Sequence, residues 1–237
     1  MRIILSESTA EAVSAVTTIL MDKIQAEPSS VIGLATGRTM EPVYADLVKK
    51  EANLKKTFFF MLDEYMGLPE NHPSSFKQYI KDHLLNPLML DESQVAFPPV
   101  TLSNGGEHYE RILTEAGGVD IQLLGIGQNG HIGFNEPGST KESRTRVVRL
   151  TEETRQANQS HFGMEEMPRE ALSMGISTIL SAKSLVMLAT GKSKAETIKY
   201  LLNHHDDPTC PATFLKSHPH FVLVLDPDAA SKINLKI

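Results

Sequence analysis

The chain has 237 residues, of which 41% are hydrophobic and 22% are charged, and its formal net charge is −6. These values are ordinary for a soluble globular protein, and the negative charge argues against nonspecific binding to nucleic acid. The single cysteine, Cys210, excludes an intrachain disulfide and argues against a cysteine-based metal site.

The sequence shows neither a membrane span nor a signal peptide. No apolar run approaches the roughly 20 residues that a membrane span needs. The apolar start of the chain turns polar after MRIIL, which is too short for a signal peptide. We therefore expect a cytoplasmic protein with no membrane or nucleic-acid partner, which agrees with the low cysteine content.

Short apolar runs alternate with segments of helical period along the chain. In chain order they predict strand Arg2–Leu5, helix Thr9–Gln25, strand Val31–Leu34, helix Glu41–Lys50, strand Phe58–Leu62, helices Ser74–Leu85 and Glu107–Ala116, strand Ile121–Ile126, strand Leu185–Thr190, helices Ser193–Leu202 and Ala212–Ser217, and strand Phe221–Leu225. Ser8 is a candidate cap of the first helix, with Glu11 placed as in a capping box.

This alternation of strands and helices predicts the fold class. It favours an α/β protein with three layers, in which an open, mainly parallel, Rossmann-like sheet carries helices on both faces. No repeat, low-complexity tract or linker interrupts the pattern. Residues 1–237 are therefore predicted to form a single domain.

Polar loops follow three of the predicted strands, and the first of them suits an anion. Open α/β sheets bind ligands outside the carboxyl ends of their strands. The loop Thr36-Gly37-Arg38-Thr39 comes between a strand and a helix, and it offers backbone N–H groups, hydroxyls and a guanidinium to a phosphate. It matches neither a Walker A loop nor G-x-G-x-x-G. A plain strand-to-helix turn with a threonine cap is the alternative.

The other two loops carry acid–base groups. Asp63 and Glu64 directly follow the third predicted strand, where a carboxylate serves either as a base or as a cap of the next turn. The glycine-rich loop after Ile121–Ile126 carries Asn129, His131 and Glu136. Imidazole titrates near neutrality, so this loop indicates proton transfer, with a capping histidine in a glycine-rich turn as the alternative. Together the three loops point to a sugar-phosphate enzyme.

The chain resembles the glucosamine-6-phosphate deaminase (isomerase) family. The matching stretches are GLATGRTMEPVY at 33–44, LDEYMGLPENHPSSF at 62–76, LLGIGQNGHIGFNEPGS at 123–139 and SRTRVVRLTEETRQAN at 143–158, with weaker matches in ALSMGISTIL at 171–180 and GKSKAETI at 191–198. They span nearly the whole chain in the order of the family. The combination of LDEY-x-GL with GHIGFNEP is very specific.

This resemblance implies that glucosamine 6-phosphate and water become fructose 6-phosphate and ammonia. His131 matches the base that opens the pyranose ring, and Glu136 matches the carboxylate that orients that imidazole. Asn129 lies in the same relay, where an amide hydrogen-bonds without accepting a full proton. Asp63 matches the base that removes the C2 proton. The resemblance implies no metal or organic cofactor, a small amino-sugar phosphate as partner, and a monomer or homo-oligomer.

Phosphate binding is also assigned by resemblance, to Thr36, Gly37, Arg38 and Thr39. Arg144, in a basic cluster near the third loop, is a further candidate for substrate contact, although surface charge explains it equally well.

The phosphate loop departs from the family pattern. It reads TGRTM where TGGTP or TGSTP is usual. Ser160 stands where many members carry an arginine, and His220 stands where some carry a lysine. We hypothesise that Arg38 supplies the cationic contact with phosphate that is missing at these two positions.

Three alternatives share much of this pattern. A galactosamine-6-phosphate deaminase/isomerase would use the same base and relay, with a different contact at the C4 hydroxyl. A 6-phosphogluconolactonase-type hydrolase would need no C2 base. A sugar-phosphate sensor without catalysis is favoured by the altered phosphate contacts but not by the presence of Asp63, His131 and Glu136.

Overall fold

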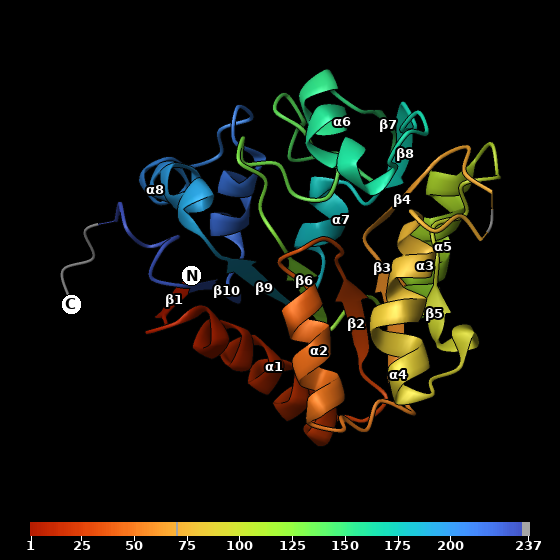
Figure 1. Ribbon diagram of the computed structural model, residues 1–237, viewed down its shortest axis with the longest axis horizontal. Coiled ribbons are helices and arrows are strands. Elements are labelled where there is room, and N and C mark those ends of the chain that lie inside the picture. The colour runs from red at the N-terminus through yellow and green to blue at the C-terminus, as the bar shows by residue number, and fades with distance from the viewer. Residues whose placement is uncertain (70, 234–237) are drawn as a thin grey trace.

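A parallel sheet of seven strands runs through the centre of the computed structural model, which describes residues 1–69 and 71–233 (Figure 1). From edge to edge, its strands are β1 (Arg2–Leu5), β10 (Phe221–Leu225), β9 (Ser184–Ala189), β6 (Ile121–Leu124), β2 (Val31–Leu34), β3 (Phe58–Met61) and β5 (Val95–Ala96). All of their pairings are parallel. β2 and β6 are buried along their whole length, as expected of strands that are covered on both faces.

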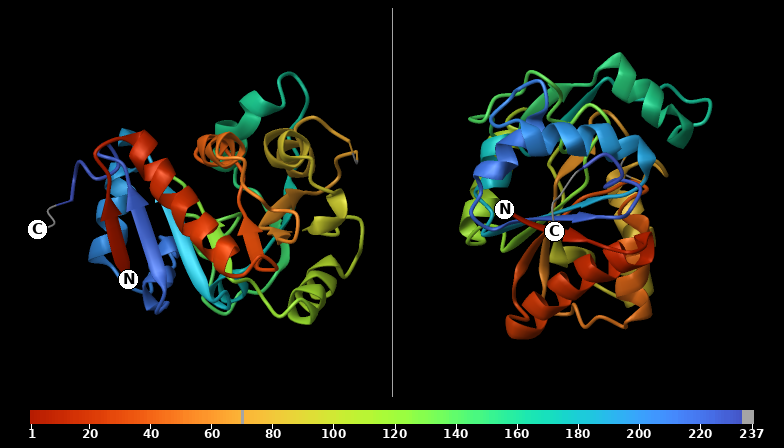
Figure 2. Two further views of the ribbon diagram at one scale, coloured as in Figure 1. Left: turned by 90° about the horizontal axis from the view of Figure 1, so that it is seen from below. Right: turned by 90° about the vertical axis from the view of Figure 1, so that its left-hand side faces the viewer.

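Helices cover both faces of this sheet (Figures 1 and 2). One face carries α1 (Thr9–Ala26), α2 (Glu41–Lys49) and α3 (Phe76–Ile80), and the other carries α5 (Gly105–Glu115), α7 (Ile176–Leu180) and α8 (Ala195–Asn203). After β2 the chain moves toward β5, and after β6 it moves toward β1. Right-handed crossovers in opposite directions place their helices on opposite faces. The predicted three-layer α/β fold with a mainly parallel sheet is confirmed.

The predicted helices agree with α1, α2, α5 and α8 to within two residues at each end. The predicted helix Ala212–Ser217 is instead a 3-10 helix, Pro211–Ser217, and α7 and the helix Glu152–Asn158 are absent from the predicted elements. Ser8 caps α1, because its hydroxyl accepts from the Glu11 N–H at 3.2 Å. The Glu11 carboxylate bonds the N–H of Glu7 at 2.7 Å. α3 continues through a π-helical turn, Lys81–Leu85, into the short helix α4, Asn86–Leu88. Among the described residues, no helix has the length and apolar character needed to cross a membrane.

A second, antiparallel sheet is absent from the predicted elements. Its three strands, in order, are β4 (Asp63–Tyr65), β8 (Glu170–Ser173) and β7 (Arg146–Arg149). β7 and β8 are joined by a segment that contains α6 (Glu152–Asn158). A small apolar cluster packs against this sheet, and it includes Tyr65 of β4 together with Phe134 and Phe162. β4 directly follows β3, so the second sheet begins where a central strand ends.

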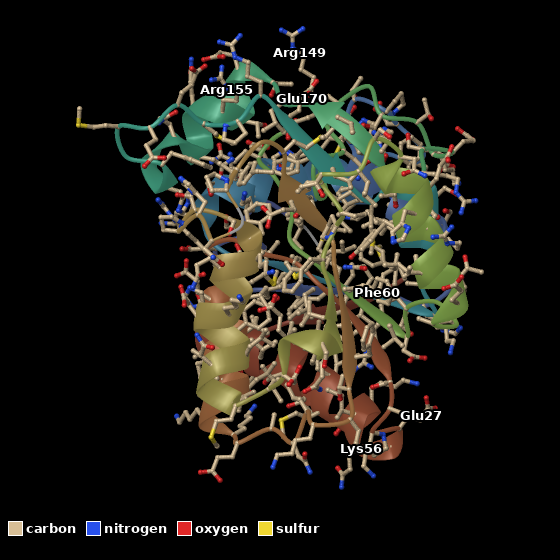
Figure 3. The ribbon with its side chains drawn as sticks, turned by 90° about the vertical axis from the view of Figure 1, so that its right-hand side faces the viewer. Glu27, Lys56, Phe60, Arg149, Arg155 and Glu170 are labelled. Carbon is tan, nitrogen blue, oxygen red and sulfur yellow. The ribbon has the colours of Figure 1, made fainter. Side chains whose placement is uncertain are left out.

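The small sheet and α6 stand at the carboxyl end of the parallel strands. Figure 3 shows Arg149, Arg155 and Glu170 at this end of the molecule, whereas Glu27 and Lys56, which precede β2 and β3, lie at the other end. β2 and β6 are neighbours, yet the chain leaves them toward opposite faces. Such a switch point opens a crevice at the carboxyl edge, which is where sheets of this kind bind ligands.

Gly175 is a position where this arrangement tolerates no side chain. It precedes α7, and a Cβ atom there would lie 2.1 Å from the carbonyl oxygen of Ser143 and 2.4 Å from that of Arg144. We expect Gly175→Ala to lower the free energy of unfolding by about 1–3 kcal/mol, the usual cost of overpacking. Urea denaturation measures the change. In the control Gly125→Ala, the added methyl meets only the Met40 methyl at 3.7 Å. Equal losses in both variants would contradict the packing argument.

Candidate active site

A cavity of about 820 Å³ lies at the carboxyl edge of the sheet, around the switch point. Loops after four neighbouring strands, β9, β6, β2 and β3, form its floor. Residues of the α3 region form one wall, and Thr154, Gln156, Asn158 and His161 contribute from α6 and the turn after it. We call residues 151–167, which connect β7 to β8 over the cavity, the covering segment.

The cavity brings together most of the predicted site residues. Seven of the nine candidates line it, namely Thr36, Gly37, Arg38, Thr39, Asp63, Asn129 and His131. Glu136 does not line it but contacts two residues that do. The three loops that follow β2, β3 and β6 therefore converge on one space, as the sequence predicts, although their roles stay predictions.

The loop after β2 presents its donors to the cavity side of the sheet. Two tyrosines hold its carbonyl groups, because the Tyr44 hydroxyl donates to Ala35 O at 2.5 Å and the Tyr79 hydroxyl donates to Gly37 O at 3.0 Å. Gly37 has a φ of +99°, which favours glycine. Within the described residues, the N–H groups of Thr36–Thr39 donate to no acceptor of the chain. These donors, just before α2, suit an anion.

Two cations accompany this loop. Arg38 is exposed, and its Nη2 lies 3.5 Å from the hydroxyl of Ser160 on the covering segment. Lys194, in the loop after β9, is half-buried in the cavity lining, and burial lowers its pKa. The described residues include no carboxylate in an ion pair with Lys194.

Lys194 is absent from the residues that the sequence predicts for the site, whereas His220 is considered there as the place of a missing family lysine. Lys194 belongs to the stretch GKSK that follows β9, so the rule applied to the other strand ends would have found it. His220 directly precedes β10 and does not line the cavity. It therefore lies at the amino end of that strand, where it reaches no ligand bound at the opposite edge.

Arg144 also lies outside the cavity. Its Nη2 is 2.5 Å from Oε2 of Glu110, and 67% of its side chain is exposed. Glu110 additionally accepts hydrogen bonds from Thr145, which follows Arg144, and from Thr178. Arg144 thus belongs to a contact between α5 and the approach to β7, and the prediction that it touches substrate has no support in this geometry.

Asp63 is a buried carboxyl group at the junction of β3 and β4. It is only 5% exposed, and Glu64 next to it is 6% exposed. Burial, and secondly the charge of Glu64, raises the pKa of Asp63 to about 8. Glu64 accepts from the N–H groups of Phe76 and Lys77 and so holds the start of α3 against β4. Asp63 is therefore a base of raised proton affinity at the cavity surface.

The loop that carries His131 passes directly over Asp63. Gly133 has a φ of +55°, and a Cβ atom at this position would lie 3.2 Å from Oδ2 of Asp63. A side chain at 133 would therefore separate the loop from the carboxyl group. Glycine here brings the imidazole loop and the carboxylate to the same part of the cavity.

A chain of hydrogen bonds defines the tautomer of His131. Asn129 donates from Nδ2 to Oε2 of Glu136 at 3.0 Å, since a carboxylate only accepts. This orientation of the amide turns Oδ1 of Asn129 toward Nδ1 of His131, at 2.7 Å. Nδ1 must then carry the proton, which leaves the lone pair on Nε2. The geometry thus prepares His131 to accept a proton through Nε2.

The chain matches a family model described as glucosamine-6-phosphate isomerases/6-phosphogluconolactonase over residues 5–223. The chain belongs to this family. A glucosamine-6-phosphate deaminase of Rhodopirellula baltica is 46% identical over 223 residues, which cover 91% of this chain and 89% of that protein.

Solved structures of the glucosamine-6-phosphate isomerase/6-phosphogluconolactonase family agree with the fold. A monomeric glucosamine-6-phosphate deaminase superposes with a TM-score of 0.94 at 37% identity, covering 98% of this chain and all of that one. A 6-phosphogluconolactonase from Leishmania guyanensis superposes with a TM-score of 0.79 at 22% identity, covering 99% of both chains, which shows the shared fold alone.

The burial of Asp63 predicts a cost in stability. Its pKa is about 8 in the folded protein and about 3.9 in an unfolded chain, so the folded state holds its proton to higher pH. Stability is therefore lost as the pH rises from about 4 to 8. Asp63→Asn removes this loss, and we expect it to stabilise the protein at pH 7 by up to about 4 kcal/mol. The gain should vanish near pH 4 in denaturation experiments.

Asp46→Asn is the matched control for this experiment. Burial alone would raise the pKa of Asp46, but hydrogen bonds from Lys50 and Thr17 outweigh burial and lower that pKa. This variant should therefore lose stability at pH 7. A loss of stability at pH 7 in Asp63→Asn as well would contradict the raised pKa of Asp63.

Proposed function

We propose that this protein is a glucosamine-6-phosphate deaminase, which converts glucosamine 6-phosphate and water to fructose 6-phosphate and ammonia. The observation that carries the proposal is the shared cavity of a buried carboxyl group, Asp63, and an imidazole with a defined tautomer, His131. The anion loop lies in the same cavity. Relatives of this name cover most of the chain and support the same reaction.

The first step is opening of the pyranose ring. In this proposal, Nε2 of His131 takes the proton of the anomeric hydroxyl and returns a proton to the ring oxygen, so that the C1–O5 bond breaks and an aldehyde forms. Asn129 and Glu136 keep the imidazole in the required tautomer throughout.

The second step is isomerisation, followed by loss of nitrogen. The aldehyde acidifies the proton on C2, and Asp63 removes it to give an enolamine. Protonation at C1 gives an imine at C2, and water hydrolyses this imine to the ketone and ammonia. A positioned base of this kind typically contributes about 10²–10⁴-fold to the rate.

The phosphate, in this proposal, is bound by the loop Thr36–Thr39 together with Arg38 and Lys194. The backbone donors bind its oxygens, and the two cations compensate its charge. The 3.5 Å approach of Arg38 to Ser160 supports the hypothesis that Arg38 replaces an arginine at position 160. Lys194 supplies the second cation, so no substitute is needed for a lysine at position 220.

Ammonia release tests the reaction and separates it from the alternatives. We expect release from glucosamine 6-phosphate, and a lactonase or a sensor would give none. Galactosamine 6-phosphate assayed in parallel identifies the preferred epimer. Faster release from that sugar would assign the protein to galactosamine 6-phosphate instead.

Asp63→Asn tests the assigned base. We expect ammonia release to fall by at least about 10²-fold, because an amide removes no proton from C2. Affinity for the sugar phosphate should change little. In the wild-type protein, kcat/KM should rise with pH toward about 8, since only the ionised carboxylate accepts a proton. Turnover at the wild-type rate in this variant would remove Asp63 from the mechanism.

Arg38→Ala and Lys194→Ala test the phosphate contacts. A hydrogen bond to a charged group contributes about 1.5–3 kcal/mol, so each variant should raise KM by about tenfold or more. kcat should change less, because neither side chain acts on C1 or C2. Arg144→Ala removes an arginine outside the cavity and is the matched control. A normal KM in Arg38→Ala would refute the idea that Arg38 replaces the cation missing at Ser160.

A further inference from the structure

Glu136 has one more hydrogen-bond partner, and it comes from the covering segment. Oε1 of Glu136 accepts from the hydroxyl of Thr154, while Oε2 accepts from Asn129. Glu136 is 8% exposed and Thr154 is 3% exposed. Both oxygens of the carboxylate are therefore bonded within the protein, one from the loop after β6 and one from α6.

Thr154 is held in place by its own helix. Its N–H donates to Oγ1 of Thr151 at 3.2 Å, and its carbonyl accepts from Nδ2 of Asn158 at 2.9 Å. The hydroxyl of Thr154 points away from the helix and donates to Glu136. The bond between them thus joins α6 to the imidazole loop through a buried contact.

The covering segment is in turn anchored to the opposite wall of the cavity. The Ser74 hydroxyl donates to the carbonyl of His161 at 2.7 Å, and Nε2 of His72 lies 2.8 Å from Oε2 of Glu165. The Phe162 ring packs at 5.3 Å, centroid to centroid, from Tyr65 of β4. These contacts determine where Thr154 stands relative to Glu136.

Glu136 supports the amide orientation of Asn129 that defines the tautomer of His131. A carboxylate bonded at both oxygens by fixed donors cannot rotate without breaking a hydrogen bond in a buried place, where an unsatisfied polar group is unfavourable. Without the Thr154 hydroxyl, Oε1 loses its donor and the carboxylate gains freedom to turn. The Asn129 amide then loses the acceptor of its Nδ2, which is one of the two bonds that orient it. The other, from the N–H of His131 to Oδ1 of Asn129 at 3.1 Å, remains, so Nδ1 of His131 keeps its acceptor in a less firmly held position.

We propose that Thr154 is a positioning residue for ring opening, which acts through Glu136 and Asn129 on His131. The covering segment then completes the ring-opening machinery as well as closing over the substrate. This proposal rests on the proposed deaminase function, so ammonia release by the wild-type protein is measured first. A wild-type protein that releases no ammonia from either amino-sugar phosphate refutes the proposed function, whatever the variants do.

The test compares three substitutions in the full-length protein. Thr154→Val removes the hydroxyl and keeps the shape, and we expect kcat for ammonia release to fall by tenfold or more with KM changed less than threefold. Thr154→Ser restores the hydroxyl and should recover most of the rate. Thr178→Val is the matched control, because Thr178 also donates from a buried hydroxyl to a carboxylate, that of Glu110, away from the cavity. It should stay within twofold of wild type.

A ligand without a ring separates positioning from a general structural role. The substrate reduced at C1, an acyclic amino alcohol phosphate, needs no ring opening but uses the same phosphate contacts. Thr154→Val should bind it within twofold of wild type by calorimetry. The proposal is overturned if kcat is unchanged in Thr154→Val, if serine fails to restore the rate, or if affinity for the acyclic ligand falls in parallel with kcat.

Discussion

The shared direction of the seven central strands is the constraint on which the site depends. Because all their pairings are parallel, the loops that follow them emerge at one edge of the sheet. β2 and β6 lie side by side and lead to opposite faces, so their loops part and leave a crevice. Residues that are far apart in the sequence, such as Thr36, Asp63, His131 and Lys194, meet there because they follow parallel strands.

The second sheet and the covering segment add walls to this crevice. β4 continues from β3 and pairs with β8, so the strand that ends at the site also starts the structure above it. Asp63 stands at this junction and is buried from both sides. Burial opposes ionisation of its carboxyl group and so lowers the stability of the fold, at the position where we propose the base that removes the C2 proton.

Six of the seven central strands and the positions of the three polar loops could be predicted from sequence because their signals are local, whereas the two-residue edge strand β5 is too short to give one. Apolar runs such as Val31–Leu34 and Phe221–Leu225 match their strands to the residue. β4 was missed because the sequence Asp-Glu-Tyr has no strand pattern, and only tertiary pairing with β8 makes it one. The proposed role of Thr154 could not be predicted from sequence, since it arises from a contact with Glu136 that only the fold creates. Lys194, in contrast, could have been predicted, because it follows a predicted strand as the other site residues do.

The amide of Asn129 between the imidazole and Glu136 has a consequence for charge. An amide oxygen accepts a hydrogen bond but is far too weak a base to hold a proton. In the proposed mechanism, the proton that His131 takes from a sugar hydroxyl therefore stays on the imidazolium and is not passed to the Glu136 carboxylate. The imidazolium then returns a proton to the ring oxygen of the same sugar. The site thus transfers a proton between two oxygens of one molecule, with Oε2 of Glu136 at 3.6 Å from Nδ1 of the transient cation.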